Sequence, residues 1–470
     1  MKCSVINKYQ LNQNLRMDSE YFLPEYMLVY DKLEEIKTEP FKNLCKFIKK
    51  GIFDISPELY KTEGIPLIRT TEIKNPLINF DTTVFLDKET HQQFFSTELE
   101  SNDIVFTKIG ANIGDVSLLP DNYAIYNFSQ NAAAAKLLKD KNIYPEFLLC
   151  FFLSKYGNSQ IKRAVMLSGQ GKLELEDIRN LAIPSEYFRI KQLCKIMINK
   201  IKYLKNEVQN KYKDSSNLIS TELKLCDWKP KHELSYVKNF SDVNSANRYD
   251  AEYFQPKYDE IIEKIKSYPN GWDTVENIIE INDKNVTPKD SEEYKYIELS
   301  NISNNGEITG ATMDIGKNLP TRARRFVEAG ELIVSSIEGS LDSIALVTAE
   351  YNKSFCSNGF YVLKSDFYNS ETLLCLLKSI IGQMQLKKGC SGTILTAISK
   401  EELNKIILPK IPIDIQNQIK DYIQKMYKLK YQSKQLLEIA KRGVEIAIEE
   451  NEESAANWIN EQLSKIGVEL

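Results

Sequence analysis

The sequence lacks the features that would point directly to an enzyme. Its 470 residues include only two histidines, His91 and His232, too few for a histidine-based metal site or a repeated catalytic base. The phosphate-binding pattern G-x-x-x-x-G-K-S/T and the dinucleotide-binding pattern G-x-G-x-x-G are both absent. The chain also lacks an Asn/Asp-Pro-Pro-Tyr/Phe segment of the kind that holds a flipped base. No known enzyme signature is therefore found.

Cysteine pairs, long apolar runs and a strong charge of one sign are missing as well. The eight cysteines are scattered without a C-x-x-C pair, which favours reduced thiols over disulfides or zinc ligands. No window holds the about 18 apolar residues of a membrane helix, and no secretory signal opens the chain, so a cytoplasmic protein is predicted. The net charge of −4 decides little, because the 61 lysines and arginines can gather on one face.

What the sequence does contain is one phrase written twice. Residues 16–26 read RMDSEYFLPEY and residues 248–258 read RYDAEYFQPKY, with seven of eleven positions identical and an offset of 232 positions. Further similar pairs of segments keep the same order. They are 99–119 with 327–347, 127–137 with 355–365, and 168–184 with 391–409. The offset between the copies has fallen to 225 at the end of the last pair. Because chance similarity does not keep order along a whole chain, we infer an internal duplication with copies of about 230 residues.

Each copy shows the same order of predicted elements. A short helix follows the repeated phrase, from Tyr26 to Lys37 and from Tyr258 to Ser267. About 140 residues come next in which runs of Val, Ile, Thr, Tyr and Phe are bounded by Gly, Asn, Asp and Pro, a pattern typical of strands and turns. The strand-rich block ends at Pro184 or Pro409, and a long helix follows.

The two long helices are predicted from apolar spacing. Residues 190–222 and 413–442 contain no Gly or Pro, and their apolar positions recur every three or four residues, as in a coiled coil. About 30 helical residues would extend roughly 45 Å, more than a small domain needs for its own core. The predicted fold class is therefore α+β, with two β-rich domains separated by two long, antiparallel coiled-coil helices in an internal pseudo-two-fold repeat. A helix packed only along its own domain is the alternative.

The repeated phrase, the two runs Asn102–Gly110 and Gly330–Glu338, the S-G loops before a proline and the terminal helices resemble the specificity (S) subunit of type I restriction-modification systems. The resemblance covers nearly the whole chain. It implies two target recognition domains, each reading one half of a bipartite site in double-stranded DNA, and helices that fix the spacer and dock methyltransferase subunits. Two adenine methyltransferase subunits and a translocase-nuclease subunit would be the protein partners. This chain would be non-catalytic and hold no cofactor, and its partners would use S-adenosylmethionine, ATP and Mg.

On this resemblance the chain divides into six predicted segments. They are an N-terminal segment with the repeated phrase (1–40), target recognition domain 1 (41–185), spacer helix 1 (186–225), a linker with the repeated phrase (226–270), target recognition domain 2 (271–410), and spacer helix 2 with a C-terminal tail (411–470). The copies differ where Lys108 and Gly110 become Ser336 and Glu338, and where Asn131 becomes Gly359. Domains that read different bases are expected to differ in this way.

Candidate DNA contacts follow from side-chain chemistry, because Arg, Lys, Asn and Gln read base edges and any positive charge can meet a phosphate. In the first block the candidates are Arg69, Thr70 and Thr71 at a strand end, Lys108 and Asn112 on a glycine-flanked loop, and Gln170 and Lys172 in an S-G loop. In the second they are Arg322, Arg324 and Arg325, the densest basic cluster, with Lys387, Lys388 and Ser391. Each could equally be a solvated surface residue.

The repeated phrase itself is not expected to read bases, because a motif kept in both copies cannot distinguish two half-sites. We predict a turn entering a helix, held by an ion pair between Arg16 and Asp18 or Glu20, and between Arg248 and Asp250 or Glu252. The acidic C-terminal run is predicted to form extra helix or a docking tail. Two other functions stay open from sequence alone, a coiled-coil scaffold that never binds DNA and a nuclease with an unrecognised site.

Overall fold

The computed structural model describes residues 19–140, 142–165, 171–392 and 396–468. The chain forms two compact units, Met1–Lys205 with Lys430–Leu470 (unit 1) and Asn206–Leu429 (unit 2). Unit 1 contains the first strand-rich block and unit 2 contains the second. Within the described ranges, no helix is both long and apolar enough to span a bilayer.

Unit 1 is built on two sheets and a short ribbon. An antiparallel sheet has the order β2-β8-β5-β6, with bounds Cys45–Lys50, Ala132–Leu137, Ile104–Thr107 and Val116–Leu118. A second sheet has the order β4-β3-β7, with bounds Val84–Leu86, Ile65–Ile68 and Asn127–Phe128, and β3 is parallel to β7. The ribbon pairs β1 (Thr38–Pro40) with β9 (Ala182–Pro184). The β-branched and aromatic residues of these strands form a core between the sheets.

Unit 2 repeats this topology. One sheet has the order β11-β18-β15-β16, with bounds Glu280–Asn282, Phe360–Lys364, Leu332–Ser335 and Ile344–Leu346. The other has the order β13-β12-β17-β14, with bounds Thr312–Ile315, Glu293–Ile297, Ser354–Ser357 and Ala323–Val327, and β12 is parallel to β17. A ribbon again pairs β10 (Trp272–Thr274) with β21 (Ile407–Pro409), and β19 (Cys390–Ser391) pairs with β20 (Ala397–Ile398). The first sheet and the ribbon have the same strand order in both units, and the second sheet of unit 2 differs by the additional edge strand β14, so the internal repeat is confirmed.

The helices after the repeated phrase begin two residues earlier than predicted. α1 spans Pro24–Glu34 and α8 spans Pro256–Lys266, so each starts at a proline. Proline fits the first helical position, because its fixed φ suits the helix and its missing N–H would have no partner there. Other short helices are α2 (Lys88–Gln93), α5 (Leu175–Arg179), α7 (Phe240–Ala246), α9 (Val275–Ile278) and α12 (Lys400–Asn404).

Each strand-rich block also contains a helix pair that the sequence did not reveal. The pairs are α3 (Pro145–Leu153) with α4 (Lys155–Ala164), and α10 (Ser370–Lys378) with α11 (Ile380–Gly389). Residues 146–153 of α3 are all buried, so its sequence shows no polar face and no helical period. A short apolar run of this kind cannot be separated from a buried strand by periodicity.

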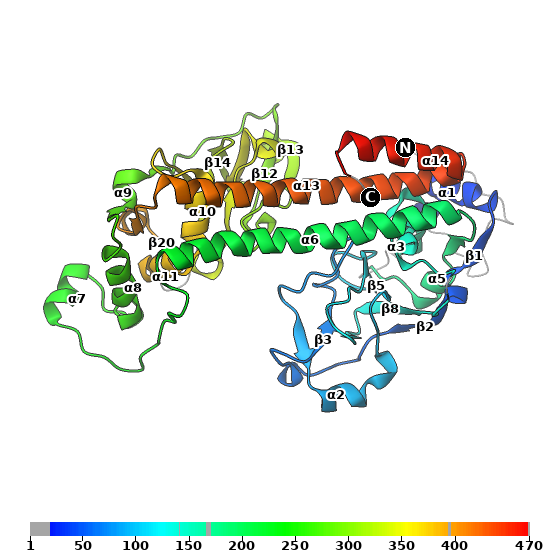
Figure 1. Cartoon of the computed structure of the whole chain (residues 1–470), viewed down its shortest axis with the longest axis horizontal. Coiled ribbons are helices and arrows are strands. Elements are labelled where there is room, and N and C mark those ends of the chain that lie inside the picture. The colour runs from blue at the N-terminus through cyan, green and yellow to red at the C-terminus, as the bar shows by residue number, and fades with distance from the viewer. Residues whose placement is uncertain (1–18, 141, 166–170, 393–395, 469–470) are drawn as a thin grey trace. The chain divides into compact units, whose positions relative to one another are not determined.

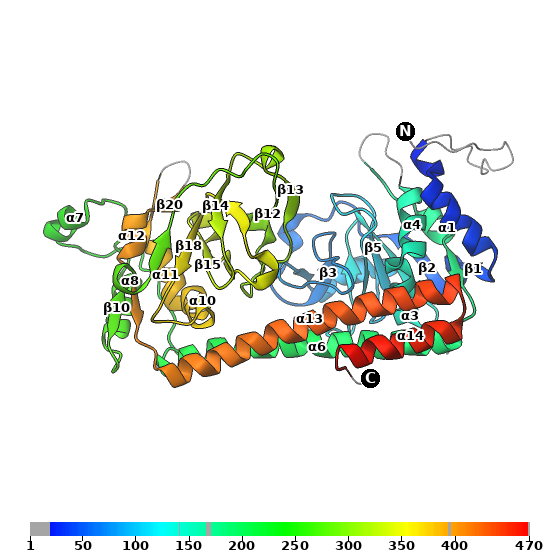
Figure 2. The same cartoon turned by 90° about the horizontal axis from the view of Figure 1, so that it is seen from above.

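The two long helices are confirmed, as α6 (Phe188–Glu222) and α13 (Ile413–Glu449). They lie side by side and run in opposite directions (Figures 1 and 2). In unit 2 the Lys211 ammonium lies 5.6 Å from the centre of the Tyr422 ring on the facing helix. In unit 1 the backbone N–H of Ile190 donates to the carboxylate of Glu452, which lies just after the end of α13, at 3.0 Å.

The C-terminal run forms a helix, α14 (Glu452–Lys465), as one of the two predicted outcomes. A Cβ atom on Gly443 of α13 would lie 2.5 Å from the Ile459 side chain, so α14 packs closely on α13 at this glycine. The cysteines at described positions are all free thiols, as predicted, and five of them are buried.

Candidate nucleic-acid interface

Three loops of unit 1 meet at the end of β5. The loop from Lys108 to Gly114 joins β5 to β6, and the backbone N–H of Lys108 donates to the Asn131 carbonyl at 2.9 Å. The Lys108 carbonyl accepts from the Leu173 N–H at 3.0 Å, which ties in the loop that follows α4. The Thr70 hydroxyl would lie 3.9 Å from a Cβ on Gly110, so the loop after β3 is also adjacent. The structure therefore brings Thr70, Lys108 and the Lys172 segment together.

Unit 2 joins the corresponding loops by the same backbone hydrogen bonds. The N–H of Ser336, the counterpart of Lys108, donates to the Gly359 carbonyl at 2.9 Å. The Ser336 carbonyl accepts from the Ile398 N–H at 2.8 Å, as the Lys108 carbonyl accepts from Leu173. The two units thus present the same loop framework with different side chains on it, which is the arrangement needed to recognise two different sequences with one fold.

Lys108 provides a positive charge that its own unit does not neutralise. The residue is 6 % exposed, and its ammonium has no hydrogen-bond or ion-pair partner among the residues that the structure describes. Burial lowers the pKa of Lys108, and the nearby positive charges of Lys172 and Lys50 lower it further. Glu174 opposes this effect, but it is bound to Lys172 at 2.7 Å. A phosphate group would neutralise this excess of positive charge.

Lys50 and Phe53 belong to the same loop cluster and were missed by sequence reasoning. The Ile52 N–H donates to the Phe128 carbonyl at 2.8 Å, which places the loop after β2 beside the turn that carries Asn131. The Phe53 ring is 70 % exposed and the Lys50 ammonium lies 5.2 Å from its centre. An exposed aromatic ring beside a lysine can stack on a base or insert between base steps. The signal in the sequence was the string KKGIF at 49–53, two lysines and an aromatic residue around a glycine.

Replacing Lys108 by methionine should weaken binding to all duplex sequences alike. The variant keeps the buried stem and removes the charge, so we expect about a 10- to 150-fold loss of affinity, the worth of a hydrogen bond to a charged group. The slope of log affinity against log salt should fall by about one. DNA titrations at several salt concentrations measure both, with Lys37→Met, at an exposed position between α1 and β1, as the control. An unchanged salt slope would show that Lys108 meets no phosphate.

Arg69 is held by a buried carboxylate. Glu72 has a fully buried side chain, and its oxygens accept from Arg69 Nη2 at 2.7 Å, from Arg69 Nε at 3.2 Å and from the Arg69 backbone N–H at 2.8 Å. The hydroxyls of Thr71 and Thr82 also donate to it, each at 2.9 Å. The pKa of Arg69 is raised chiefly by this hydrogen bonding to Glu72. Arg69 therefore holds the loop in place. Only the part of its guanidinium that Glu72 does not bind can contact DNA.

The corresponding loop of unit 2 has the same backbone but a different charge. Asn301 stands where unit 1 has Glu72, and its side-chain oxygen accepts from the Glu298 N–H at 2.8 Å. Glu298 therefore occupies the position of Arg69. The loop conformation is held by residue 72 or 301, which leaves residues 69 and 298 free to differ.

Replacing Glu72 by alanine should destabilise unit 1 by about 3 kcal/mol, because it leaves the half-buried Arg69 charge and several donors without an acceptor. Asn301→Ala removes one neutral hydrogen bond at the matching position of unit 2 and should cost only about 1 kcal/mol. Urea unfolding followed by hydrogen exchange in each unit measures both values. Equal losses in the two variants would contradict the role assigned to Glu72.

The basic cluster of unit 2 serves two different purposes. Arg325 donates to the Asn285 side chain at 2.9 Å and to the Asp283 carbonyl, and Arg324 donates to the Thr287 hydroxyl at 2.8 Å. These two arginines therefore hold the 283–287 loop. Arg322 is exposed, and within the described ranges its side chain makes no hydrogen bond or ion pair. Of the three, Arg322 is the one placed to meet a phosphate.

The other candidates of the second block lie elsewhere. The Lys388 ammonium is 3.5 Å from Asp259 and 5.2 Å from the Tyr253 ring centre, so it contacts the repeated phrase and not the 322–325 cluster. Lys387 and Ser391 are exposed on either side of it, Lys387 at the end of α11 and Ser391 in β19. In unit 1, Thr71 and Asn112 are exposed and Lys172 is partly exposed, whereas Gln170 lies outside the described residues.

The repeated phrase is held as predicted where the structure describes it. Arg248 Nη2 lies 2.6 Å from the Asp250 carboxylate, which confirms that ion pair, and it also donates to the Cys390 carbonyl at 2.7 Å. Arg16 and Asp18 lie outside the described residues. Both copies place a cation over the first ring of the Tyr-Phe pair, Arg163 over Tyr21 at 4.0 Å and Lys388 over Tyr253 at 5.2 Å. Lys388, predicted to contact DNA, is thus the counterpart of a structural arginine.

Among the described residues, no group of three or more His, Cys, Asp or Glu side chains is arranged to hold a metal ion. The loops of unit 1 that carry the DNA-contact candidates present lysine, threonine and asparagine side chains and one exposed aromatic ring. Buried hydrogen bonds hold these loops in place. This composition is typical of a surface that binds phosphates and base edges.

Comparison with known proteins gives one family match. Residues 34–185 match the model of the type I restriction modification DNA specificity domain. No curated protein sequence matches the chain.

Three solved structures are similar to the chain at low sequence identity. The S subunit of a type I restriction-modification system from M. genitalium has 14 % identity and a TM-score of 0.39, over 92 % of this chain and 96 % of that one. The HsdS subunit from Thermoanaerobacter tengcongensis has 13 % identity and a TM-score of 0.29, over 88 % and 97 %. A structure described as complex assembly and conformational transition of the type I R-M system has 14 % identity and a TM-score of 0.26, over 92 % and 97 %.

Proposed function

We propose that this chain, whose residues 34–185 are a type I restriction modification DNA specificity domain, is the DNA-recognition subunit of a type I restriction-modification complex. The observation that carries the proposal is the repetition of that domain's framework in unit 2, down to the hydrogen bonds of Lys108 and Ser336. Two modules with one framework and different loop side chains suit a bipartite target, with one module for each half-site.

The chain would work through partners that carry out the chemistry. An adenine methyltransferase subunit, two copies per chain, would bring S-adenosylmethionine to the DNA site that this chain selects. A translocase-nuclease subunit would add ATP- and Mg-dependent restriction. The long helices α6 and α13, each of which contributes residues to both units, would set the spacing between the half-sites.

The purified chain is expected to bind duplex DNA without methylating or cutting it. Its affinity for a cognate bipartite site should exceed that for random DNA by about 10³-fold or more, a typical ratio for specific DNA-binding proteins. Addition of an adenine methyltransferase partner should then give methylation at that site alone. Methylation or cleavage by the lone polypeptide would contradict the proposal, and so would a chain that binds no DNA and only assembles other proteins.

A further inference from the structure

The matching loops of the two units carry opposite charges. The residues before Leu173 and Ile398 correspond, because the N–H groups of these two residues donate to matching carbonyls. The register of β2 on β8 and of β11 on β18 aligns Lys50 with Asp283. Four cations of unit 1 therefore stand where unit 2 has two carboxylates and two neutral residues. In chain order they are Lys50, Arg69, Lys108 and Lys172 in unit 1, and Asp283, Glu298, Ser336 and Ala397 in unit 2.

The ion pairs within each unit leave this contrast in place. In unit 1 two of the four cations are bound by carboxylates, whereas Lys50 and Lys108 form no ion pair with the residues that the structure describes. In unit 2, Asp283 pairs with Lys400 at 2.8 Å, and Glu298 forms no ion pair within the described ranges. The loops of unit 2 thus present one uncompensated carboxylate. A phosphate is repelled by such a group, and a hydrogen-bond donor is attracted to it.

Glu298 lies at an edge of the second sheet of unit 2, where the ends of three strands meet. β12 runs parallel to β17 with Ile297 opposite Cys356, so Glu298 lies beside the end of β17. The Asn358 N–H donates to the Arg322 carbonyl at 2.8 Å, which brings the start of β14 to the same edge. The edge therefore carries Glu298 next to the arginine that is placed to meet a phosphate.

The two charges act on one hydroxyl but do not bind each other. Burial raises the pKa of Tyr296, the Glu298 carboxylate adds to this rise, and the Arg322 guanidinium opposes it. Both charged side chains are exposed, and they form no ion pair with each other. An available cation beside an available acceptor suits a groove of DNA, in which phosphates flank the base edges.

The backbone around Glu298 is fixed, which positions its carboxylate. The Asn301 side-chain oxygen accepts from the Glu298 N–H at 2.8 Å, and the capping box of the two residues places the Glu298 carboxylate at the Asn301 N–H. A single N–H engages one oxygen, so the other oxygen remains an acceptor. Because an ionised carboxylate can only accept, the group that it meets on DNA must donate.

The donors that bases present in the major groove are the amino groups of cytosine and adenine. Adenine carries the acceptor N7 beside its amino group, and this lone pair repels a carboxylate, whereas the cytosine ring has no acceptor on that edge. We infer that Glu298 is a specificity-determining residue of unit 2, whose carboxylate accepts a hydrogen bond from the amino group of a cytosine in the half-site. The inference rests on the proposed function and adds one base of the target to it.

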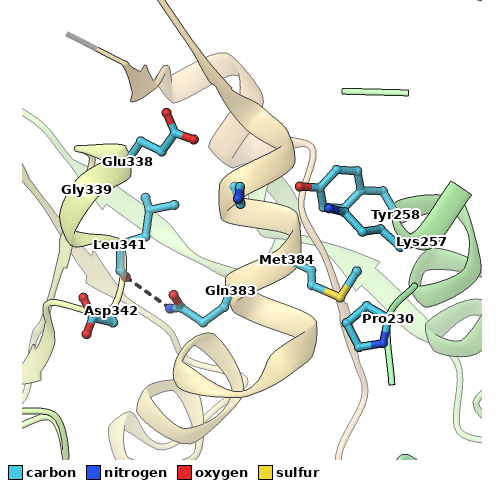
Figure 3. Close-up of a pocket in the computed structure, with 10 residues that line it drawn as sticks. Pro230, Lys257, Tyr258, Glu338, Gly339, Leu341, Asp342, Gln383 and Met384 are labelled. Carbon is cyan, nitrogen blue, oxygen red and sulfur yellow. Dashed lines mark hydrogen bonds between the residues drawn. The ribbon is translucent and has the colours of Figure 1, made fainter. Parts of the chain in front are cut away.

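A second carboxylate of unit 2, Glu338, provides a matched control. It stands where unit 1 has Gly110. Figure 3 shows Glu338 on its loop beside α11, along a pocket of about 340 Å³ that Tyr258 and Met384 also line. Its neighbours are the helices α8 and α11 and not the strand ends that surround Glu298. Glu338→Gln therefore removes the same charge from the same unit at a different place.

Sequencing the duplexes that the full-length chain selects from a random pool tests the inference. One position of the half-site, the one that exchange of residues 271–410 alters, should show a preference of about tenfold for cytosine. Glu298→Gln should reduce this preference to about twofold at that position alone, because an amide both donates and accepts. Glu298→Ala should do the same, and Glu338→Gln should leave every position unchanged.

A change in the DNA tests the same contact from the other side. Replacing that cytosine by 2-pyrimidinone removes the amino group and keeps the rest of the ring. The loss of affinity should be about tenfold larger for the original chain than for Glu298→Gln. Any effect of the altered base on the duplex itself is common to both chains and cancels in the comparison.

Three results would overturn the inference. If Glu298→Gln selects the same bases as the original chain, the residue does not read DNA, although the proposed function still stands. An equal loss of affinity for all sequences would likewise leave the proposed function standing and make Glu298 a residue that only holds its loop. An original chain that selects no sequence would overturn the inference and the proposed function together.

Discussion

Under the proposed function, replacing residues 41–185 by the corresponding residues of a known type I specificity subunit should change one half of the methylated site and leave the other half as it was. If unit 1 alone recognises its half-site, the exchanged block should recognise the half-site of the protein from which it was taken. For the exchanged chain, each base pair of the original half-site that is now a mismatch should weaken binding by about 1–3 kcal/mol, or roughly 5- to 150-fold in affinity. Sequencing all methylated adenines, after incubation with a methyltransferase partner, reads out both halves at once.

The structure gives a physical reason why this exchange should fold. Both ends of the exchanged block lie at one ribbon, where β1 pairs with β9 and the Ser185 N–H donates to the Lys37 carbonyl at 3.1 Å. The block also contacts the long helices, through Lys155 with Glu449 and through Lys202 with Asn102 at 3.3 Å. A donor block that keeps Lys155 and Asn102 should dock without strain.

The reciprocal exchange of residues 271–410 provides the control, because it should change only the other half. A change in both halves after either exchange would mean that the two modules read one continuous sequence together. No change in either half would mean that the block does not read DNA at all.

The fold could be predicted from the sequence where the signal was long or repeated. The order of similar segments revealed the duplication, and the absence of Gly and Pro over some 30 residues revealed α6 and α13. The helix pairs α3–α4 and α10–α11 were not predictable, because α3 is buried on all sides and shows no period. The sequence also did not reveal that Lys388 corresponds to Arg163. The two side chains share only their positive charge, and the correspondence becomes visible in their contacts with the Tyr-Phe pair.

The candidate site was predictable in its loops but not in its side chains. Lys108 and Thr70 meet at one cluster, but the sequence could not show that Glu72 binds Arg69. Lys50 and Phe53 were not predicted, because they are far from Lys108 in the sequence and reach the cluster from another strand. A basic string such as TRARR gives the charge of a surface, and only the contacts show which arginines are already bound.

Arg322 and Arg325 should therefore give opposite results when replaced. Arg322→Ala is expected to lower DNA affinity about 5- to 10-fold and the salt slope by about one, without a change in stability, because its exposed side chain is placed to meet a phosphate. Arg325→Ala is expected to speed hydrogen exchange in the 283–287 loop and to destabilise unit 2 by about 2 kcal/mol, because it removes three hydrogen bonds to that loop and to the Phe360 carbonyl.

A lysine at each position separates charge from geometry. Arg322→Lys should keep most of the affinity, since a phosphate accepts any cation, whereas Arg325→Lys should destabilise nearly as much as alanine, because lysine cannot form the forked hydrogen bonds of a guanidinium. Salt-dependent DNA titration and hydrogen exchange on all four variants give the two readouts. If Arg325→Lys is fully stable and binds DNA normally while Arg325→Ala loses affinity alone, Arg325 contacts DNA by its charge and the 283–287 loop does not need it.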